Sequence, residues 1–147
     1  MPESPSDAEF PPAELQADCF EAVRRAHQSE MAEDYVELIA ALIAQKGEAR
    51  PVDIACCLGV SQPTVSKNLN RLKRDGMVNH APYRAVFLTE EGQALALACA
   101  RRHRIVVSFL VALGVDGETA EQDAEGLEHH VSDRTLAAFM RFIEDRG

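Results

Sequence analysis

Residues 51–76 contain two short helix patterns separated by a tight turn, and this arrangement constrains the fold more than any other feature. Pro51 suits the first turn of a helix, and Gly59 supplies the permissive backbone that a tight turn needs. Ser61 is a good N-cap for the second helix. The apolar positions expected to form the core of this unit are Ile54, Leu58, Val60, Val65, Leu69 and Leu72. The pattern predicts a helix-turn-helix.

The flanking segments extend this unit into a winged helix. Residues 13–46 contain no Pro or Gly, and apolar side chains recur at steps of three and four, which predicts one long amphipathic helix ended by Gly47. Residues 77–89 alternate apolar and polar side chains around residues 82–84, which predicts a β-hairpin. A helix, a helix-turn-helix and a hairpin in this order are typical of a winged helix-turn-helix.

The remainder of the chain is predicted to be helical. Thr89 can cap a helix that runs to about Leu113, and two shorter helices follow near residues 118–131 and 132–145. The expected fold class is therefore mainly α with a small β-hairpin wing. We expect a disordered tail at 1–12, a long N-terminal helix with the winged helix-turn-helix at 13–91, and a helical domain at 92–147.

The charge of the chain is uneven. With 15 Lys and Arg against 24 Asp and Glu, the net charge is −9, which argues against a generic nucleic-acid binder. Residues 47–89, however, hold six basic and three acidic side chains, a local charge of +3. No apolar run reaches the length of a membrane helix, and there is no secretory signal pattern. The four cysteines form no CxxC pair, so we expect reduced thiols and a cytoplasmic location.

The second helix of the helix-turn-helix would read base edges in the major groove of double-stranded DNA. Its polar residues offer suitable groups, because Gln and Asn can pair with adenine, Lys with guanine, and the Thr methyl with thymine. Candidates for base contacts are Gln62, Thr64, Lys67 and Asn68. Candidates for contacts with the phosphate backbone, or with the minor groove at the hairpin tip, are Lys73, Arg74, Tyr83 and Arg84. The alternative is a polar helix face that is merely solvated.

Two acidic segments and one histidine form a candidate metal site. Asp34 and Glu37 share a face of the long helix, and Glu125, Glu128 and His129 have the spacing i, i+3, i+4. His103 lies in the helix between these segments. A set of four carboxylates and two imidazoles without sulfur suits Mn(II) or Fe(II). Taken singly, each piece is also typical of a solvated helix face.

Four segments, at residues 33–39, 59–67, 83–89 and 123–130, resemble the manganese-responsive branch of the DtxR family of metal-dependent transcriptional regulators. The resemblance implies a homodimer with a helical dimerisation and metal-binding domain, a palindromic operator, and Mn(II), two ions per protomer, with Fe(II) as another effector. The ligands it implies are Asp34, Glu37, His103, Glu125, Glu128 and His129. The iron-sensing branch has Met and Cys at the positions of Asp34 and Glu125, so these two residues favour manganese.

The function we expect is that of a manganese-responsive repressor of manganese uptake genes, and not an enzyme. In this mechanism, metal joins the DNA-binding unit to the dimerisation side. A metal-independent winged-helix regulator is one alternative, because each acidic face could be incidental. A carboxylate-bridged dimetal enzyme is another, since helices bearing Glu and Glu-x-x-His build such sites. That reading is disfavoured because the chain offers no further nucleophile or proton-transfer group.

Overall fold

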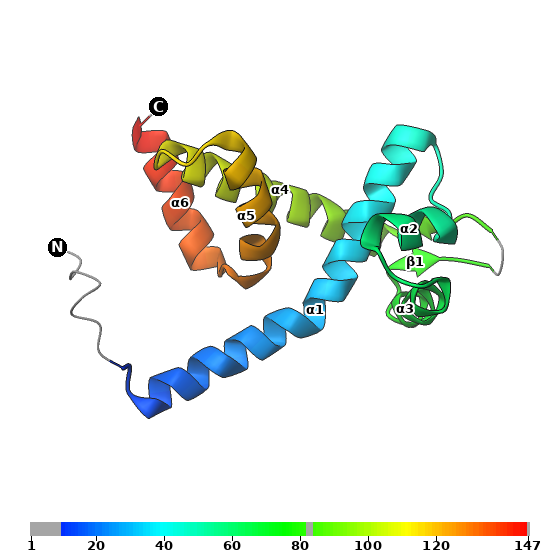
Figure 1. The fold of residues 1–147 in the computed structure, drawn as a ribbon, viewed down its shortest axis with the longest axis horizontal. Helices are drawn as coiled ribbons and strands as arrows, with labels where there is room; N and C mark the ends of the chain where they lie inside the picture. Colours follow the sequence, from blue (N-terminus) through cyan, green and yellow to red (C-terminus); the bar gives the residue numbers. More distant parts are fainter. Residues whose placement is uncertain (1–9, 82–83, 147) are drawn as a thin grey trace.

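The computed structural model describes residues 10–81 and 84–146, which form two lobes (Figure 1). The elements in chain order are α1 (Ala13–Lys46), α2 (Pro51–Leu58), α3 (Gln62–Arg74), β1 (Val78–Asn79), β2 (Phe87–Leu88), α4 (Glu90–Ala112), α5 (Gly117–Leu127), the 3₁₀ turn η2 (Glu128–His130) and α6 (Asp133–Arg146). The prediction of a mainly α fold with a small β-hairpin is confirmed. The predicted tail lies mostly outside the described residues.

The first lobe is the helix-turn-helix and its wing. Gly59 adopts a left-handed conformation (φ 67°) that ends α2, and the Ser61 hydroxyl accepts a hydrogen bond from the Thr64 N–H at 3.3 Å. The lobe's core combines α1 with both helices and the wing through Tyr35, Ile39, Leu42, Ala49, Ile54, Ala55, Val65, Leu69, Leu72, Val78 and Val86. Val60 was predicted for this core, and that prediction is wrong. Its side chain is 38% exposed, because the turn after Gly59 leaves it at the edge of a cleft.

The wing is shorter than the alternation predicted. Val78 pairs with Leu88 and Asn79 with Phe87 in an antiparallel ladder. Val86 does not continue this pairing; its N–H donates to the Ala49 carbonyl at 2.7 Å instead. The linker after α1 therefore contributes a bridge beside the wing.

The wing joins α4 at a very close backbone approach. Thr89 caps α4 as predicted, because its hydroxyl accepts from the Gly92 N–H at 3.0 Å. The same hydroxyl donates to the Gly76 carbonyl at 2.5 Å. A Cβ atom at Gly92 would lie 2.0 Å from the Met77 carbonyl oxygen, so only glycine fits this position without movement.

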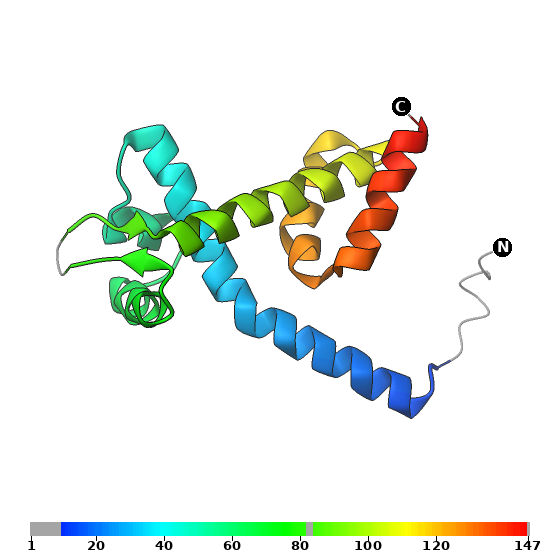
Figure 2. The same ribbon diagram turned by 180° about the vertical axis from the view of Figure 1, so that it is seen from behind.

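The second lobe is helical and has its own small core. Val106, Ala124 and Leu136 are buried there, and the Phe109 ring stacks on Phe139 with centroids 3.9 Å apart. Seen from behind, α4 runs from the wing into this lobe (Figure 2). The predicted helix near 118–131 is interrupted, since the α-helix ends at Leu127 and residues 128–130 form the tighter 3₁₀ turn.

The N-terminal half of α1 extends away from both lobes (Figure 1). We call residues 13–29 the arm. Gln16 and Ala26 are half-buried, and all other arm residues are exposed. The amphipathic stripe predicted for α1 is therefore buried only beyond the arm, and Phe20 and Val23 remain 60% and 45% exposed. None of the helices in the described ranges is long and apolar enough to cross a membrane.

Candidate functional site

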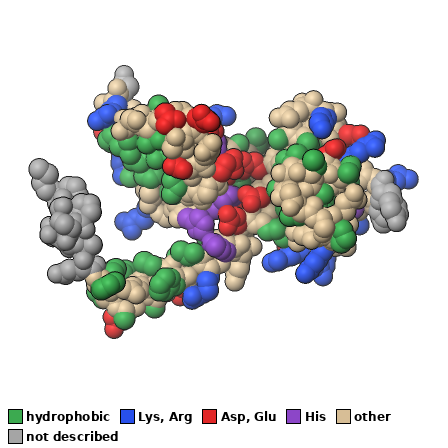
Figure 3. All heavy atoms as spheres, in the orientation of Figure 1, with side chains coloured by type: hydrophobic (Ala, Val, Ile, Leu, Met, Phe, Trp, Pro, Cys, Tyr) green, Lys and Arg blue, Asp and Glu red, His purple; other side chains and the backbone are tan. Residues whose placement is uncertain are grey.

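Acidic and histidine side chains gather between the two lobes (Figure 3). They come from α1 on one side and from α4, α5 and η2 on the other. Two of the groups contain predicted ligands, and within each group one ligand atom per residue lies within 4.8 Å of the others. The first group is Glu30, Asp34 and His129, and the second is Glu37, Glu125 and Glu128. The fold thus brings together donors more than 80 residues apart in the sequence.

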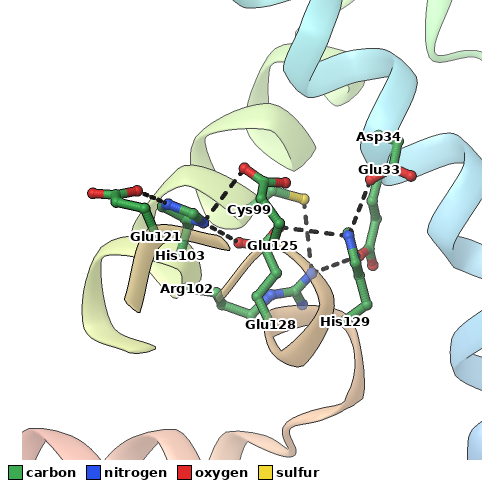
Figure 4. Close-up of polar contacts among 9 residues, drawn as sticks. All are labelled: Glu33, Asp34, Cys99, Arg102, His103, Glu121, Glu125, Glu128 and His129. Atoms are coloured by element: carbon green, nitrogen blue, oxygen red, sulfur yellow. Dashed lines mark hydrogen bonds and ion pairs between the residues drawn. The ribbon is translucent and has the colours of Figure 1, made fainter. Parts of the chain in front are cut away.

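His129 links the donors of α1 to those of η2 (Figure 4). Its Nδ1 lies 2.5 Å from Oε2 of Glu33, and Arg102 donates to the same oxygen at 2.8 Å. Its Nε2 lies 3.0 Å from Oδ1 of Asp34 and 3.7 Å from Oε1 of Glu128. A carboxylate on one ring nitrogen fixes the orientation of an imidazole and leaves the other nitrogen for a ligand. Glu33 and Arg102 therefore aim Nε2 of His129 at the acidic group.

Glu128 is fully buried at the centre of the acidic group. Within the described part of the chain, neither of its oxygens has a hydrogen-bond donor, unless a proton is shared with Glu37. Burial, followed by the charges of Glu37 and Glu125, raises the pKa of Glu128 to about 8. A buried carboxylate in this position needs either a proton or a cation.

Burial and neighbouring negative charge also act on the carboxyl groups that α1 brings to this region. Burial raises the pKa of Asp34, and the charges of Glu30 and Glu125 add to this effect. Burial and the charge of Glu125 likewise raise the pKa of Glu37. Crowded carboxylates with raised pKa values, close to imidazole nitrogens, fit a divalent cation of the harder class.

His103 reaches the acidic group from α4. Its Nδ1 lies 3.3 Å from Oε2 of Glu128 and 3.6 Å from Oε1 of Glu125, and it has no hydrogen-bond partner among the described residues. Its Nε2 lies 2.6 Å from Oε2 of Glu121. The structure therefore gathers all six residues that were predicted as ligands, and their role as ligands remains a prediction.

Sequence reasoning missed three acidic residues of this region, Glu30, Glu33 and Glu121. Each precedes a predicted ligand on the same helix by four residues, namely Asp34, Glu37 and Glu125 in that order. Residues i and i+4 share a helix face, so the helical period carried a signal for all three.

A separate surface lies between α3 and the wing. It is a groove of about 1240 Å³, and α3 lines it with Gln62, Ser66, Asn70 and Lys73. Arg50, at the start of α2, and Arg84, between β1 and β2, also line it. Lys73 also donates from Nζ to the His80 carbonyl at 3.0 Å, which ties α3 to the wing. Ser66 and Asn70 were not predicted, although their four-residue spacing from Gln62 indicates a common face.

The remaining residues predicted to contact DNA have different surroundings. Lys67 and Arg74 are exposed, and Thr64 is exposed with its hydroxyl 2.9 Å from that of Ser61. Asn68 is half-buried and donates from Nδ2 to the phenol oxygen of Tyr35 at 3.0 Å. We therefore leave Asn68 out of the proposed base contacts. Tyr83 lies outside the described residues.

Two family models match successive parts of the chain. Residues 27–86 match the iron dependent repressor N-terminal DNA binding domain. Residues 89–146 match the iron dependent repressor metal binding and dimerisation domain. The boundary between the two matches falls at β2, the second strand of the wing.

Curated relatives and solved structures agree with these matches. The chain is 55% identical over 128 residues to the transcriptional regulator MntR of Escherichia coli O6:H1, covering 87% of this chain and 83% of that protein. It is 40% identical over 117 residues to the HTH-type transcriptional regulator MntR of Bacillus subtilis strain 168, covering 77% and 82%. A structure described as a manganese-dependent transcriptional repressor in complex with manganese is similar with a TM-score of 0.68 and 37% identity. That match covers 77% of this chain and 52% of the other, so the chain spans about half of its length.

Proposed function

Because this chain belongs to the iron-dependent repressor (DtxR) family of metal-responsive, DNA-binding transcriptional regulators, we propose that Mn(II) is its effector and that manganese uptake genes are its targets. The family's second domain is a dimerisation domain, and its curated relatives are transcriptional regulators and not enzymes. The curated relatives named MntR and the manganese-dependent repressor structure support manganese as the ion.

One observation carries this proposal: the donors come from both lobes. Asp34 and Glu37 lie on α1, which shares its core with α3, whereas Glu125, Glu128 and His129 belong to the helical lobe. Side chains that meet at one centre hold α1 against η2 and α5. Tyr35, Ile39 and Leu42 of α1 pack in one core with α3, which is the proposed DNA recognition helix. Fixing the position of α1 therefore also fixes the position of the recognition helix.

A bound divalent ion would supply the positive charge that the crowded carboxylates lack. We propose Asp34, Glu37, His103, Glu125, Glu128 and His129 as the ligands. The two donor groups described above support two ions per protomer, with Glu128 and His129 adjacent at their boundary. Fe(II) is the second candidate ion, because the same oxygen-rich set suits it.

The DNA-binding surface of the proposed regulator is the groove between α3 and the wing. Gln62, Ser66, Asn70 and Arg84 line it, while Lys67 is exposed on α3. In a symmetric dimer two such helices face half-sites about one helical turn apart, so we propose a palindromic operator.

The protomer leaves apolar side chains uncovered on the arm and on α4. The arm exposes Phe20 and Val23, and α4 exposes Leu97 and Val111. Exposed large apolar side chains on these two helices suit an interaction surface, and the family's second domain is a dimerisation domain. We propose that the partner protomer covers part of this surface.

The test is a Mn(II) titration of chelator-stripped protein, with free Mn(II) followed by electron paramagnetic resonance. We expect uptake approaching two ions per chain, reduced in Glu125→Ala. In parallel, Asp34→Ala should weaken metal-stimulated operator binding and leave dimerisation intact. Asp18→Ala, which removes an exposed acid of the arm, is the matched control. No uptake at micromolar Mn(II) overturns the proposal.

A metal-independent regulator predicts the same operator affinity with and without a chelator. The buried Glu128 side chain favours a cation site, because without a cation the folded protein must keep a proton on this group at neutral pH.

A further inference from the structure

A second cluster of donors lies where the arm of α1 leaves the body of the protein. His27 and Glu30 are three residues apart on α1, and His130 is the last residue of η2. One ligand atom from each of these residues lies within 4.8 Å of the others. The two imidazole rings meet edge to face, with centroids 5.2 Å apart and planes at 62°. None of these three residues is among the six proposed Mn(II) ligands, although Glu30 also belongs to the donor group with Asp34 and His129.

The chemistry of this cluster differs from that of the carboxylate-rich centre. It offers two imidazole nitrogens and one carboxylate, whereas the centre offers four carboxylates and two imidazoles. Imidazole-rich sites favour Zn(II), Ni(II) and Cu(II) over Mn(II). Both histidines are exposed and Glu30 is half-buried, so an ion can enter from solvent and keep water in its remaining positions.

The position of the cluster gives it a structural consequence. Apart from the half-buried Gln16 and Ala26, the described arm residues are exposed and give the arm little packing of their own. His27 stands at the end of the arm nearest the body, opposite His130. Glu30 also belongs to the group with Asp34 and His129, so the two groups share this carboxylate.

We propose that His27, Glu30 and His130 form a separate site for a divalent ion of borderline softness, such as Zn(II), and that this ion fastens the arm to η2. The site does not depend on Mn(II) being the effector. It requires only three side chains that the fold already holds within coordinating reach of one another.

Zinc stoichiometry tests the site directly. Wild type, His27→Gln and the control His80→Gln are dialysed against buffered micromolar Zn(II), and bound zinc is counted per chain. His80 lies on the wing, away from this cluster. Wild type and the control should each bind one zinc more than His27→Gln. Equal zinc content in wild type and His27→Gln overturns the proposal and leaves the two histidines as a packed pair.

Two further measurements separate this site from the carboxylate-rich centre. Mn(II) uptake by His27→Gln should match that of wild type within about twofold, because none of the proposed Mn(II) ligands is changed; a loss larger than tenfold shows that the two sites are one. Hydrogen exchange of amides 14–26 should slow severalfold on adding Zn(II) to wild type, but not to His27→Gln. Unchanged exchange in wild type overturns the fastening of the arm.

Discussion

The phenol oxygen of Tyr35 accepts a hydrogen bond from the Asn68 side chain at 3.0 Å, and this bond joins α1 to the recognition helix. Tyr35 follows Asp34 directly in the sequence and is 3% exposed. A side chain at the metal centre and a side chain on α3 are therefore separated by one peptide bond and one hydrogen bond.

Tyr35→Phe removes this bond and keeps the ring in the core. A hydrogen bond of this kind contributes about 1 kcal/mol, so the Mn(II)-dependent gain in operator affinity should fall roughly fivefold. Mn(II) affinity should stay within twofold of wild type. Fluorescence anisotropy with a labelled operator, with and without Mn(II), measures the gain. An unchanged gain would show that coupling between the lobes bypasses this contact.

Glu33→Gln tests the orientation of His129. The amide cannot hold both the Nδ1 of His129 and the Arg102 guanidinium as the carboxylate does, so the imidazole loses its alignment. Loss of such a partner typically lowers metal affinity 10- to 100-fold. Mn(II) titration measures the change, and Glu21→Gln, an exposed acid on the same helix, is the control. Equal affinities in the two variants would remove Glu33 from the site.

Metal affinity should depend on pH through Glu128. Its pKa is raised to about 8, so below that pH an ion must displace a proton. Mn(II) affinity is therefore expected to fall by up to about tenfold per unit as the pH drops from 8 to 6. The dependence should flatten in Glu128→Gln, although the overall affinity of this variant will be low. A wild-type affinity that is constant over this range contradicts the assignment.

The same group makes the stability of the metal-free protein depend on pH in the opposite sense. Between the ordinary pKa of 4.5 and about 8, the folded protein holds a proton on Glu128 that the unfolded chain releases. The contribution of Glu128 to the free energy of unfolding is therefore largest below pH 4.5 and is lost as the pH rises through 8. Between pH 6 and 8 the melting temperature of the metal-free protein should fall, and less so in Glu128→Gln. If the melting temperatures of wild type and Glu128→Gln change equally between pH 6 and 8, Glu128 does not cause the pH dependence.

Lys67→Ala should weaken operator binding without changing Mn(II) affinity. The side chain is exposed on α3, where it can reach a base edge or a phosphate, and either loss amounts to about 1–3 kcal/mol. We expect a decrease of roughly tenfold, measured at fixed salt. Arg134→Ala, an exposed base on α6, is the matched control and should bind the operator as wild type does.

Gly92→Ala tests the contact between the wing and α4. The new Cβ atom would lie 2.0 Å from the Met77 carbonyl, so backbone must move, at a cost of about 1–3 kcal/mol in the free energy of unfolding. Gly126→Ala places the same methyl group in open space within α5 and is expected to be neutral or stabilising. Denaturant unfolding of the metal-free proteins compares the two. Equal stability of both variants would mean that the approach at Gly92 is looser than described.

Local patterns predicted most of the fold, because caps and helix periods are written in neighbouring residues. Gly47, Ser61 and Thr89 marked helix ends and starts where the structure has them. Long-range partners could not be found in this way. The bridge between Ala49 and Val86 and the bond from Asn68 to Tyr35 join segments that only the tertiary structure brings together.

In the candidate site, too, local patterns could be predicted and long-range contacts could not. Spacing on single helices indicated Asp34 with Glu37 and Glu125 with Glu128, but nothing local shows that these pairs meet. The bond between Glu33 and His129 spans 96 residues and depends on how α1 crosses η2. The exposure of the arm's apolar stripe was also beyond prediction, because amphipathic periodicity does not tell whether a face is covered by the same chain.

The continuity of α1 restricts how this gene can change in length. His27, Glu30, Asp34 and Glu37 follow one line along the helix, while Tyr35, Ile39 and Leu42 pack under the recognition helix. Inserting or deleting a single residue within this stretch turns the part of the helix before the change against the part after it by about 100°. Alignment gaps among relatives should therefore fall upstream of His27, and the segment from His27 to Leu42 should be inherited as a block of constant length.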